Sequence, residues 1–320
     1  MEKKPMTMEV DEEIKVPIMD QSEFLKDNTR NCLIQSTIAD ILKTEPCWLG
    51  IDEAGRGPVL GPMVYGTCFS PINKGDILKE MGFADSKTLN EEQRDGLFEK
   101  IKNATDVMGW MVDILSPAFI SNSMLRRIKY NLNALSHDTA IGLIRKVLSH
   151  GVNVTEIYVD TVGDPAKYQA KLKELFPDID VTVAKKADST YPIVSAASIC
   201  AKVARDQAVK SWQFSEGIKT EDNNYGSGYP SDPATKKFMS INLDRVFGFP
   251  QFVRFSWSTA SQIMEDKGVP VLWEDDDEDE NTESKGMQSL FSLFGKKEED
   301  PKLSTHSFFK ERSLQRVQCL

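Results

Sequence analysis

The chain has 320 residues, of which 40% are hydrophobic, so it is long enough to bury one large core or two ordinary ones. No run approaches the ~18 apolar residues that span a bilayer, and the first residues lack the apolar stretch of a secretory signal, which predicts a soluble intracellular protein without a membrane contact. Five cysteines without a close pair and three scattered histidines argue against a disulfide framework or a zinc knuckle, so any metal is expected to be held by oxygen atoms.

The formal net charge of −10 lies mostly outside the central part of the chain. Residues 48–273 carry 27 acidic and 26 basic side chains, whereas residues 274–300 carry 11 acidic and 3 basic ones. Such an acidic run cannot bury enough apolar surface to fold alone, and a solvated spacer is favoured over a site for a basic partner. We therefore expect five parts, which are a polar, helix-poor extension at 1–46, a compact core at 47–214, a helical lobe at 215–268, an acidic linker at 269–300 and a C-terminal segment at 301–320.

Apolar runs predict five strands in the core, at 47–52, 62–69, 107–115, 156–160 and 180–184. Pro58 and Gly61 break the chain between the first two, which is compatible with a hairpin. A helix is predicted from Asn133 to His150, closed by Gly151, and a shorter crossover follows at 167–176. These connections imply an α/β protein with a mixed five-stranded sheet whose last strands run parallel to the first.

The clearest helix prediction runs from Pro192 to Trp212, with proline in the first turn and many small residues that permit close packing on a sheet. Further helices are predicted to start at Pro233, capped by Asp232, and to cover 256–267, which together make the small helical lobe. An aromatic cluster at 247–257 surrounds two arginines. Core packing is favoured for it over a base-stacking platform, because aromatic side chains supply so much buried area.

Asp52 and Glu53 end the first predicted strand and open into Gly55, Arg56 and Gly57. Two adjacent carboxylates are costly to fold unless a metal or a phosphate offsets them. Neighbours in a regular strand face opposite sides of the sheet, so we expect the strand to end at Asp52 if both acids face one crevice. The two glycines supply the backbone freedom for such a turn.

Two further acids, Asp160 and Asp188, follow the fourth and fifth predicted strands. Residues just past the carboxyl ends of strands converge on the crevice where α/β proteins bind ligands, so all four acids are expected to meet. Mg²⁺ prefers oxygen ligands, and two such ions roughly 4 Å apart hydrolyse phosphodiesters by activating water and stabilising the leaving oxygen.

Six ordered blocks between about residues 47 and 260 resemble type 2 ribonuclease H, and within it the catalytic A subunit of the eukaryotic heterotrimeric enzyme. The blocks are GIDEAGRGPVLGP at 50–62, ADSKTL at 84–89, YVDTVG at 158–163, KAD at 186–188, SAASI at 195–199 and YGSGYP at 225–230. One such block is moderate evidence, whereas six in the family's order are strong.

The resemblance implies a ribonuclease H-like fold and an endoribonuclease that hydrolyses the RNA strand of RNA/DNA hybrids and cuts 5′ of single ribonucleotides embedded in duplex DNA. It implies Asp52, Glu53, Asp160 and Asp188 as ligands of two Mg²⁺ ions, with Asp52 bridging both and Mn²⁺ as a substitute. It also implies a nuclear role in ribonucleotide excision repair and in removing RNA primers during DNA replication.

By the same resemblance, Gly55, Arg56 and Gly57 approach the ribose 2′-hydroxyl through main-chain groups, and Tyr229 stacks on the next sugar. The remaining substrate-binding candidates are basic or hydroxyl residues for the phosphates, namely Ser86, Lys87, Lys185, Lys186, Lys202 and Arg205. An ordinary solvated pair is an equal alternative for Lys185 and Lys186. Arg205 has the alternative of an ion pair with a carboxylate of the sheet.

The expected protein partners are two non-catalytic subunits, which dock largely on 301–320, where apolar and basic residues return after the acidic linker. A tail folded back on its own core is an equal alternative from the sequence alone. Residues 288–295 resemble a sliding-clamp box, but Gly295 stands in place of its second aromatic residue, so a chance apolar patch is favoured.

Other functions compete with this interpretation. An acidic scaffold that binds a structural cation is the main non-enzyme alternative, and a proofreading-type exonuclease on the same sheet is a third. A nucleotide-binding switch fits the DxxG turn at 160–163, but the chain has no GxxxxGK[ST] phosphate loop, which excludes it.

Overall fold

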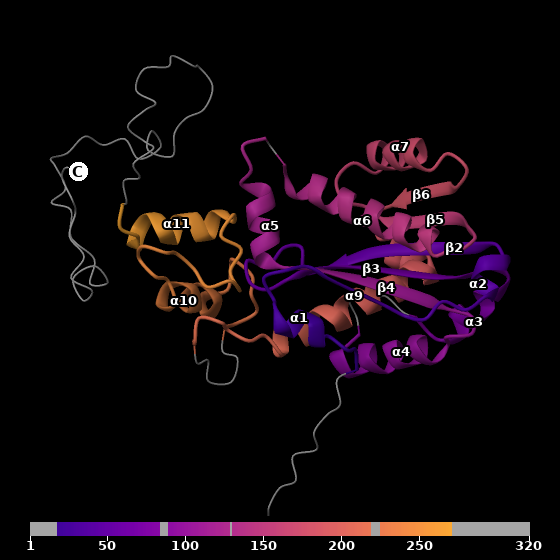
Figure 1. Ribbon diagram of the computed structural model, residues 1–320, viewed down its shortest axis with the longest axis horizontal. Helices are drawn as coiled ribbons and strands as arrows, with labels where there is room; N and C mark the ends of the chain where they lie inside the picture. The colour runs from indigo at the N-terminus through magenta and orange to yellow at the C-terminus, as the bar shows by residue number, and fades with distance from the viewer. Residues whose placement is uncertain (1–17, 84–88, 129, 219–224, 271–320) are drawn as a thin grey trace, which may run out of the picture.

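The computed structural model describes residues 18–83, 89–128, 130–218 and 225–270, and its centre is one mixed sheet (Figure 1). The sheet has six strands in the order β1-β4-β3-β2-β5-β6. Their bounds are Cys32–Gln35 (β1), Cys47–Ala54 (β2), Met63–Pro71 (β3), Gly109–Leu115 (β4), Val154–Asp160 (β5) and Asp180–Ala184 (β6).

The prediction of five strands is wrong by one, because the N-terminal segment supplies an edge strand. β1 pairs antiparallel with β4, and Cys32 lies opposite Ile114. Two short helices, α1 (Ser22–Lys26) and α2 (Ile41–Thr44), flank it in the described part of this extension, residues 18–46. A four-residue strand that alternates between half-buried and exposed positions has too weak a pattern to be recognised in sequence.

The predicted hairpin and the parallel pairing are confirmed. β2 and β3 are antiparallel from the Cys47–Pro71 pair to the Ala54–Val64 pair. β5 runs parallel to β2, and β6 runs parallel to β5. The carboxyl ends of β2, β5 and β6 therefore lie at one edge of the sheet.

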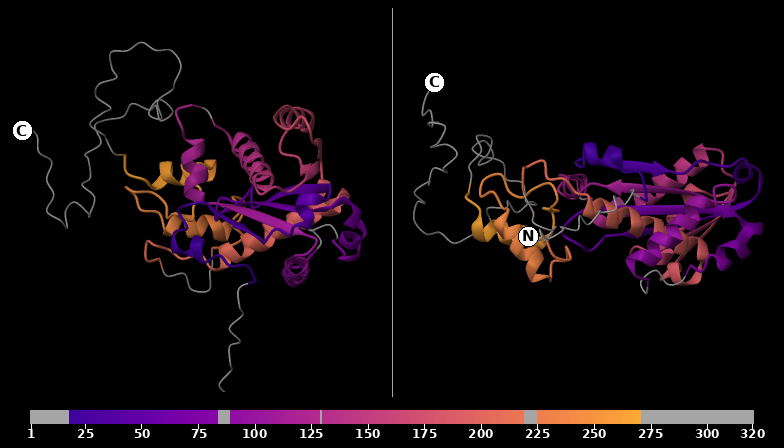
Figure 2. Two further views of the ribbon diagram at one scale, coloured as in Figure 1. Left: turned by 45° about the vertical axis from the view of Figure 1, so that its right-hand side comes forward. Right: turned by 90° about the horizontal axis from the view of Figure 1, so that it is seen from below.

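Helices cover both faces of the sheet (Figures 1 and 2). One face carries α4 (Glu91–Asn103) and α9 (Pro192–Lys210), and the other carries α6 (Leu132–Ser149) and α7 (Pro165–Leu175). Each face has its own buried core of aliphatic and aromatic side chains. Shorter helices complete the core, namely α3 (Gly75–Glu80) with a 3₁₀ turn at Ile72–Lys74, α5 (Pro117–Met124) and α8 (Ala187–Thr190).

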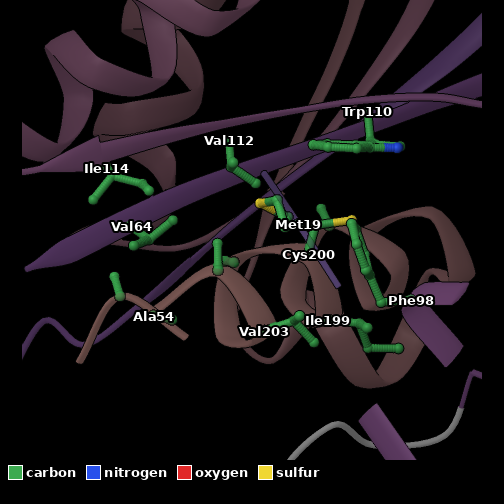
Figure 3. Close-up of a cluster of buried hydrophobic side chains, with 14 of the residues drawn as sticks. Met19, Ala54, Val64, Phe98, Trp110, Val112, Ile114, Ile199, Cys200 and Val203 are labelled. Atoms are coloured by element: carbon green, nitrogen blue, oxygen red, sulfur yellow. The ribbon is translucent and has the colours of Figure 1, made fainter. Parts of the chain in front are cut away.

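The long helix α9 lies unusually close to β2 and β3. A Cβ atom added to Gly50 or Gly66 would come within 2.4 Å of the Ile193 or Ala197 carbonyl oxygen, so only glycine fits at these crossings. Figure 3 shows Ile199, Cys200 and Val203 of α9 in the cluster that also holds Trp110 and Val112 of β4. The prediction of a helix rich in small residues that packs on the sheet is confirmed.

Local capping explains where the other predicted helices begin. Asn131 caps α6 by accepting from the Ala134 amide at 2.9 Å, and α6 ends at Ser149 before Gly151, which has φ +80°. Asp164 caps α7, and Asp232 caps α10 (Pro233–Ile241). In both of these helices proline follows the cap directly.

The lobe formed by α10 and α11 (Ser258–Lys267) lies beyond one end of the sheet in all three views (Figures 1 and 2). The predicted core packing of the aromatic cluster is confirmed for Phe252, which is fully buried with its ring centroid 4.9 Å from those of Trp212 and Tyr225, and is wrong for Phe247, which is 67% exposed. None of the helices in the described ranges is long and apolar enough to span a bilayer. The predicted linker beyond residue 270, the clamp-like box and the C-terminal segment lie outside the described residues.

Candidate active site

Three aspartates lie at the shared carboxyl edge of β2, β5 and β6. Ile51 pairs with Val159, so Asp52 and Asp160 follow at the same level of two neighbouring parallel strands. Asp188 lies in α8, directly after β6, and is 1% exposed. The strand register thus explains why acids so far apart in the chain share one edge.

Asp52 is buried, at 5% exposure, and its carboxyl group reaches Ser198 of α9. Its pKa is raised from 3.8 to about 7, mainly by burial and in smaller part by the negative charges of Asp160 and Asp188. The Ser198 hydroxyl on α9 and the Glu53 amide, at 2.7 Å, act in the opposite direction by hydrogen bonding to the carboxylate. The three aspartates therefore form a concentration of negative charge that a cation would relieve.

Asp160 and Asp188 are tied together through the backbone of the β6–α8 turn. Asp160 Oδ1 accepts from the amides of Thr161 at 3.0 Å and Ala187 at 3.1 Å. The turn contains Lys186 at φ +56°, which is the one non-glycine residue with positive φ in the described part of the chain. Ser195 Oγ donates to the Asp188 carbonyl oxygen, so α9 also fixes this turn.

Glu53 departs from the sequence-based expectation, because β2 does not end at Asp52 but continues to Ala54. Regular pairing with β3 puts Glu53 opposite Tyr65, on the face of the sheet opposite to Asp52. There burial raises the pKa of the Tyr65 and Tyr168 hydroxyls, and the Glu53 charge adds to the effect. The structure thus brings three of the four predicted acids together and places Glu53 beside two tyrosines.

The three aspartates fit a hard divalent cation by their chemistry, since carboxylate oxygens are what Mg²⁺ and Mn²⁺ bind. Burial, and to a smaller extent repulsion by Asp160 and Asp188, raises the pKa of Asp52, and a bound cation would offset the cost of this buried negative charge. Within the residues that the structure describes, no three His, Cys, Asp or Glu side chains form a ready-made metal-binding group.

Arg254 holds the loop at Gly55–Gly57 by hydrogen bonds to its carbonyl oxygens. The sequence-based prediction of the site missed this residue. Arg254 is fully buried and donates to the carbonyl oxygens of Gly55 (Nη2, 2.7 Å), Arg56 (Nη1, 3.1 Å) and Gly61 (Nε, 2.8 Å). Trp257 Nε1 donates to the Gly57 carbonyl oxygen at 3.3 Å. Three successive carbonyl groups are thereby engaged on one side of the loop. The only sequence signal was an arginine inside an aromatic cluster.

Arg254 has no carboxylate partner in an ion pair within the described ranges. Burial holds the pKa of its guanidinium well below the usual range, and the positive charge of Arg205 adds to this effect. Carbonyl dipoles and the Trp257 ring, 5.0 Å from the guanidinium carbon, are its nearest stabilising groups. Gly55 itself has φ +77°, and a Cβ there would lie 2.0 Å from Arg205 Nε.

Arg56 points from this loop to the start of α6. Its guanidinium donates to the Ser136 hydroxyl and the Asn133 side-chain oxygen, and more weakly to the Leu132 carbonyl oxygen at 3.5 Å. The loop is thus fixed between α6 on one side and residues 254–257 on the other.

Tyr229 lies next to the loop and is 51% exposed. A Cβ on Gly57 would stand 3.2 Å from its Cε1 atom. Asp232 shapes its turn by accepting from the Ser227 amide and hydroxyl, which lowers the pKa of Asp232 to about 2. The Gly228 carbonyl oxygen accepts from Val59 at 2.8 Å and so joins this turn to the chain that follows the loop.

The other predicted substrate residues are placed unevenly. Lys185 and Lys186 are exposed beside the aspartates, in agreement with either alternative for them. Arg205 packs against Gly55 and makes no ion pair with a sheet carboxylate in the described part of the chain. Lys202 is half-buried on α9, and Ser86 and Lys87 lie outside the described residues.

These features define an α/β protein with a ribonuclease H-like sheet and a carboxylate site at the ends of its parallel strands. The model of the family Ribonuclease HII matches residues 49–260. The chain therefore belongs to the ribonuclease HII family and is a ribonuclease.

Curated relatives and solved structures agree. The chain is 54% identical to the A subunit of ribonuclease H2 from Homo sapiens over 303 residues and 52% identical to the corresponding protein from Bos taurus over 302 residues; each match covers 94% of this chain and all of the relative. A crystal structure of ribonuclease H2 from Pyrococcus horikoshii OT3 matches with 34% identity and a TM-score of 0.57, over 69% of this chain and 98% of the other. The ribonuclease HII of a PCNA complex from Archaeoglobus fulgidus matches with 30% identity and a TM-score of 0.51, over 61% and 85%.

Proposed function

We propose that this chain is the catalytic subunit of an endoribonuclease that hydrolyses the RNA strand of RNA/DNA hybrids and cuts 5′ of single ribonucleotides embedded in duplex DNA. The observation that carries the proposal is the position of Asp52, Asp160 and Asp188 beside the Gly55–Gly57 loop and Tyr229. The acids that would bind metal ions then lie on the same surface as the groups that would recognise a sugar.

Asp52, Asp160 and Asp188 would hold two divalent ions, for which Mg²⁺ is proposed and Mn²⁺ as a substitute. Bound there, the ions supply an activated water and stabilise the leaving oxygen of the phosphodiester. Asp52 contributes most when ionised, so its contacts with Ser198 and the Glu53 amide favour the form that ligates.

Sugar recognition follows from the arrangement of the loop. Arg254 and Trp257 engage the carbonyl oxygens of residues 55–57, which fixes the loop's main chain before substrate binds. Main-chain groups that are held in place can recognise a 2′-hydroxyl by hydrogen bonding, because this hydroxyl both donates and accepts a hydrogen bond. Tyr229 offers a half-exposed ring for the neighbouring sugar.

The test is cleavage of a duplex that contains one ribonucleotide, with Mg²⁺ present and the cut position mapped. A cut on the 5′ side of that ribonucleotide is the expected result. Binding of a cation without hydrolysis would favour the acidic-scaffold alternative. Degradation only from free ends would favour the exonuclease.

The same proposal includes two non-catalytic subunits and a nuclear role in ribonucleotide removal and RNA primer removal. Similarity to proteins that are named as the A subunit of ribonuclease H2 supports a multi-subunit enzyme, with 301–320 as the docking segment. The Archaeoglobus fulgidus protein was solved as a complex with PCNA, which supports a clamp contact through 288–295. Truncation after Lys267 should weaken co-purification of the other subunits, and assembly at full affinity would contradict the docking role.

A further inference from the structure

The connection between α5 and α6 begins with an exposed segment, residues 125–128, with the sequence Leu-Arg-Arg-Ile, which we call the tip. Ile128 is 85% exposed and Leu125 is 62% exposed, which places them among the most exposed large apolar side chains of the described residues. Arg126 and Arg127 are exposed too, and neither makes an ion pair within the described ranges. Nothing in the fold accounts for two apolar and two cationic side chains presented together to solvent.

The tip is anchored at both of its ends. Before it, Met124 Sδ accepts from Ser256 Oγ at 3.6 Å, which links α5 to the segment that holds the loop. After it, the Tyr130 hydroxyl donates to Asp138 on α6 at 2.8 Å, and the Arg126 guanidinium carbon lies 5.3 Å from the centre of the Tyr130 ring. Met124 and Tyr130, on the two sides of the tip, are therefore held by side-chain contacts, although the side chains of the tip are exposed.

The tip also borders the candidate active site. Four residues after Ile128, Leu132 begins α6, and its carbonyl oxygen accepts from Arg56 of the Gly55–Gly57 loop. Figure 1 shows α5 between the lobe of α10 and α11 and the start of α6. The chain before the tip is thus joined to Ser256, and the chain after it is joined to Arg56 of the loop.

We infer that this tip is a contact surface for the substrate duplex, in which Leu125 and Ile128 pack on sugars of the minor groove and the two arginines contact phosphates. The inference rests on the proposed function. A hybrid duplex of A-like form has a wide, shallow minor groove lined by sugars, which apolar side chains can reach. Proteins that bind the minor groove commonly combine apolar side chains, which they insert at base steps, with arginines. The charge of the tip is complementary to nucleic acid, and its position beside the loop favours this partner over a protein.

The experiment measures equilibrium binding of a fluorescent RNA/DNA hybrid to the full-length protein in EDTA, by anisotropy at several salt concentrations. R126Q/R127Q removes the charge, and L125S/I128S removes the apolar surface. The matched controls are R145Q/K146Q, an exposed basic pair at the far end of α6, and L33S/L175S, two exposed leucines on β1 and α7.

R126Q/R127Q is expected to weaken binding roughly tenfold at 0.1 M salt and to reduce the slope of log K against log salt by about 0.9 per lost phosphate contact. L125S/I128S is expected to weaken binding roughly fivefold. The slope of log K against log salt should not change, because this variant removes no charge. Both controls should bind like the wild type. Tip variants that bind within about twofold of the wild type, while the wild type cleaves the hybrid, would overturn the tip assignment alone.

Two other outcomes would overturn it differently. If the tip variants lost a co-purifying subunit but kept hybrid affinity, the tip would be a protein interface. If the wild type neither bound nor cleaved the hybrid, the proposed function would fail together with the inference.

Discussion

Arg254 donates a hydrogen bond of 2.7 Å to the carbonyl oxygen of Gly55, although 199 residues separate the two in the chain. The same guanidinium reaches the carbonyl oxygens of Arg56 and Gly61. The lobe at the C-terminal end of the fold therefore shapes a loop that begins where the first long strand ends. This contact makes the lobe part of the active site and not only a neighbour of it.

Replacing Arg254 by lysine should lower cleavage by about 100-fold, because one ammonium cannot reach three carbonyl groups and a loop displaced by about 1 Å positions the sugar badly. Thermal unfolding should show a loss of roughly 3 kcal/mol, since buried carbonyl groups lose charged donors. Arg245→Gln is the control, because Arg245 is exposed and its side chain donates, among the described residues, to the Lys267 carbonyl oxygen alone. Equal effects of the two substitutions would refute the special role of Arg254.

Gly55→Ala and Gly217→Ala separate backbone strain from collision at the site. Both glycines have positive φ, +77° and +72°, so both substitutions should cost about 1–2 kcal/mol in backbone strain. Only at Gly55 does the new Cβ collide, with Arg205 Nε at 2.0 Å and the Pro62 carbonyl oxygen at 2.9 Å. We expect Gly55→Ala to lower the free energy of unfolding by roughly 3 kcal/mol or more and to abolish most of the cleavage activity. Gly217→Ala should retain the cleavage activity. Chemical denaturation and single-turnover rates measure both.

Asp52→Asn should abolish hydrolysis and stabilise the metal-free protein. The folded-state pKa of Asp52 is about 7 and its ordinary value is 3.8, so the unfolded chain releases this proton first as the pH rises. The free energy of unfolding of the wild type therefore falls between pH about 4 and about 7, and the asparagine variant escapes this loss. The gain should reach roughly 2–4 kcal/mol above pH 7 in EDTA and vanish near pH 3.

Asp113→Asn is the matched control for that substitution. Burial also raises the pKa of Asp113, to about 6. As the pH rises from about 4 to about 6, the Asp113→Asn variant should therefore become more stable than the wild type. Asp113 lies on β4, which is not one of the three strands whose ends carry the aspartates, and cleavage should persist. Retained turnover in Asp52→Asn at saturating Mg²⁺ would remove Asp52 from the site.

Tyr229→Ala should reduce cleavage at a single embedded ribonucleotide by roughly 10–100-fold while binding of the duplex changes much less, because the ring positions the scissile bond. Tyr229→Phe isolates the hydroxyl. Phe247→Ala is the control, since Phe247 is an exposed aromatic residue of the same lobe. Equal losses of binding and cleavage in Tyr229→Ala would make Tyr229 an affinity contact only.

The sequence by itself determined the long elements and the identity of the acids. Local capping and periodicity act over a few residues, and they explain four helices. These are α9 with its small residues, α7 and α10, which each begin with aspartate and proline, and α6, which ends before a glycine. The aspartates were recognisable because each follows an apolar run in a motif.

Only the tertiary structure decided what depends on pairing between distant segments. Regular pairing with β3 carries β2 past Asp52 and turns Glu53 to the other face, and pairing with β4 makes an edge strand of Cys32–Gln35. The hydrogen bonds from Arg254 to the Gly55–Gly57 loop likewise join residues about 200 positions apart. Such contacts depend on which segments meet in space, and local sequence patterns carry no information about that.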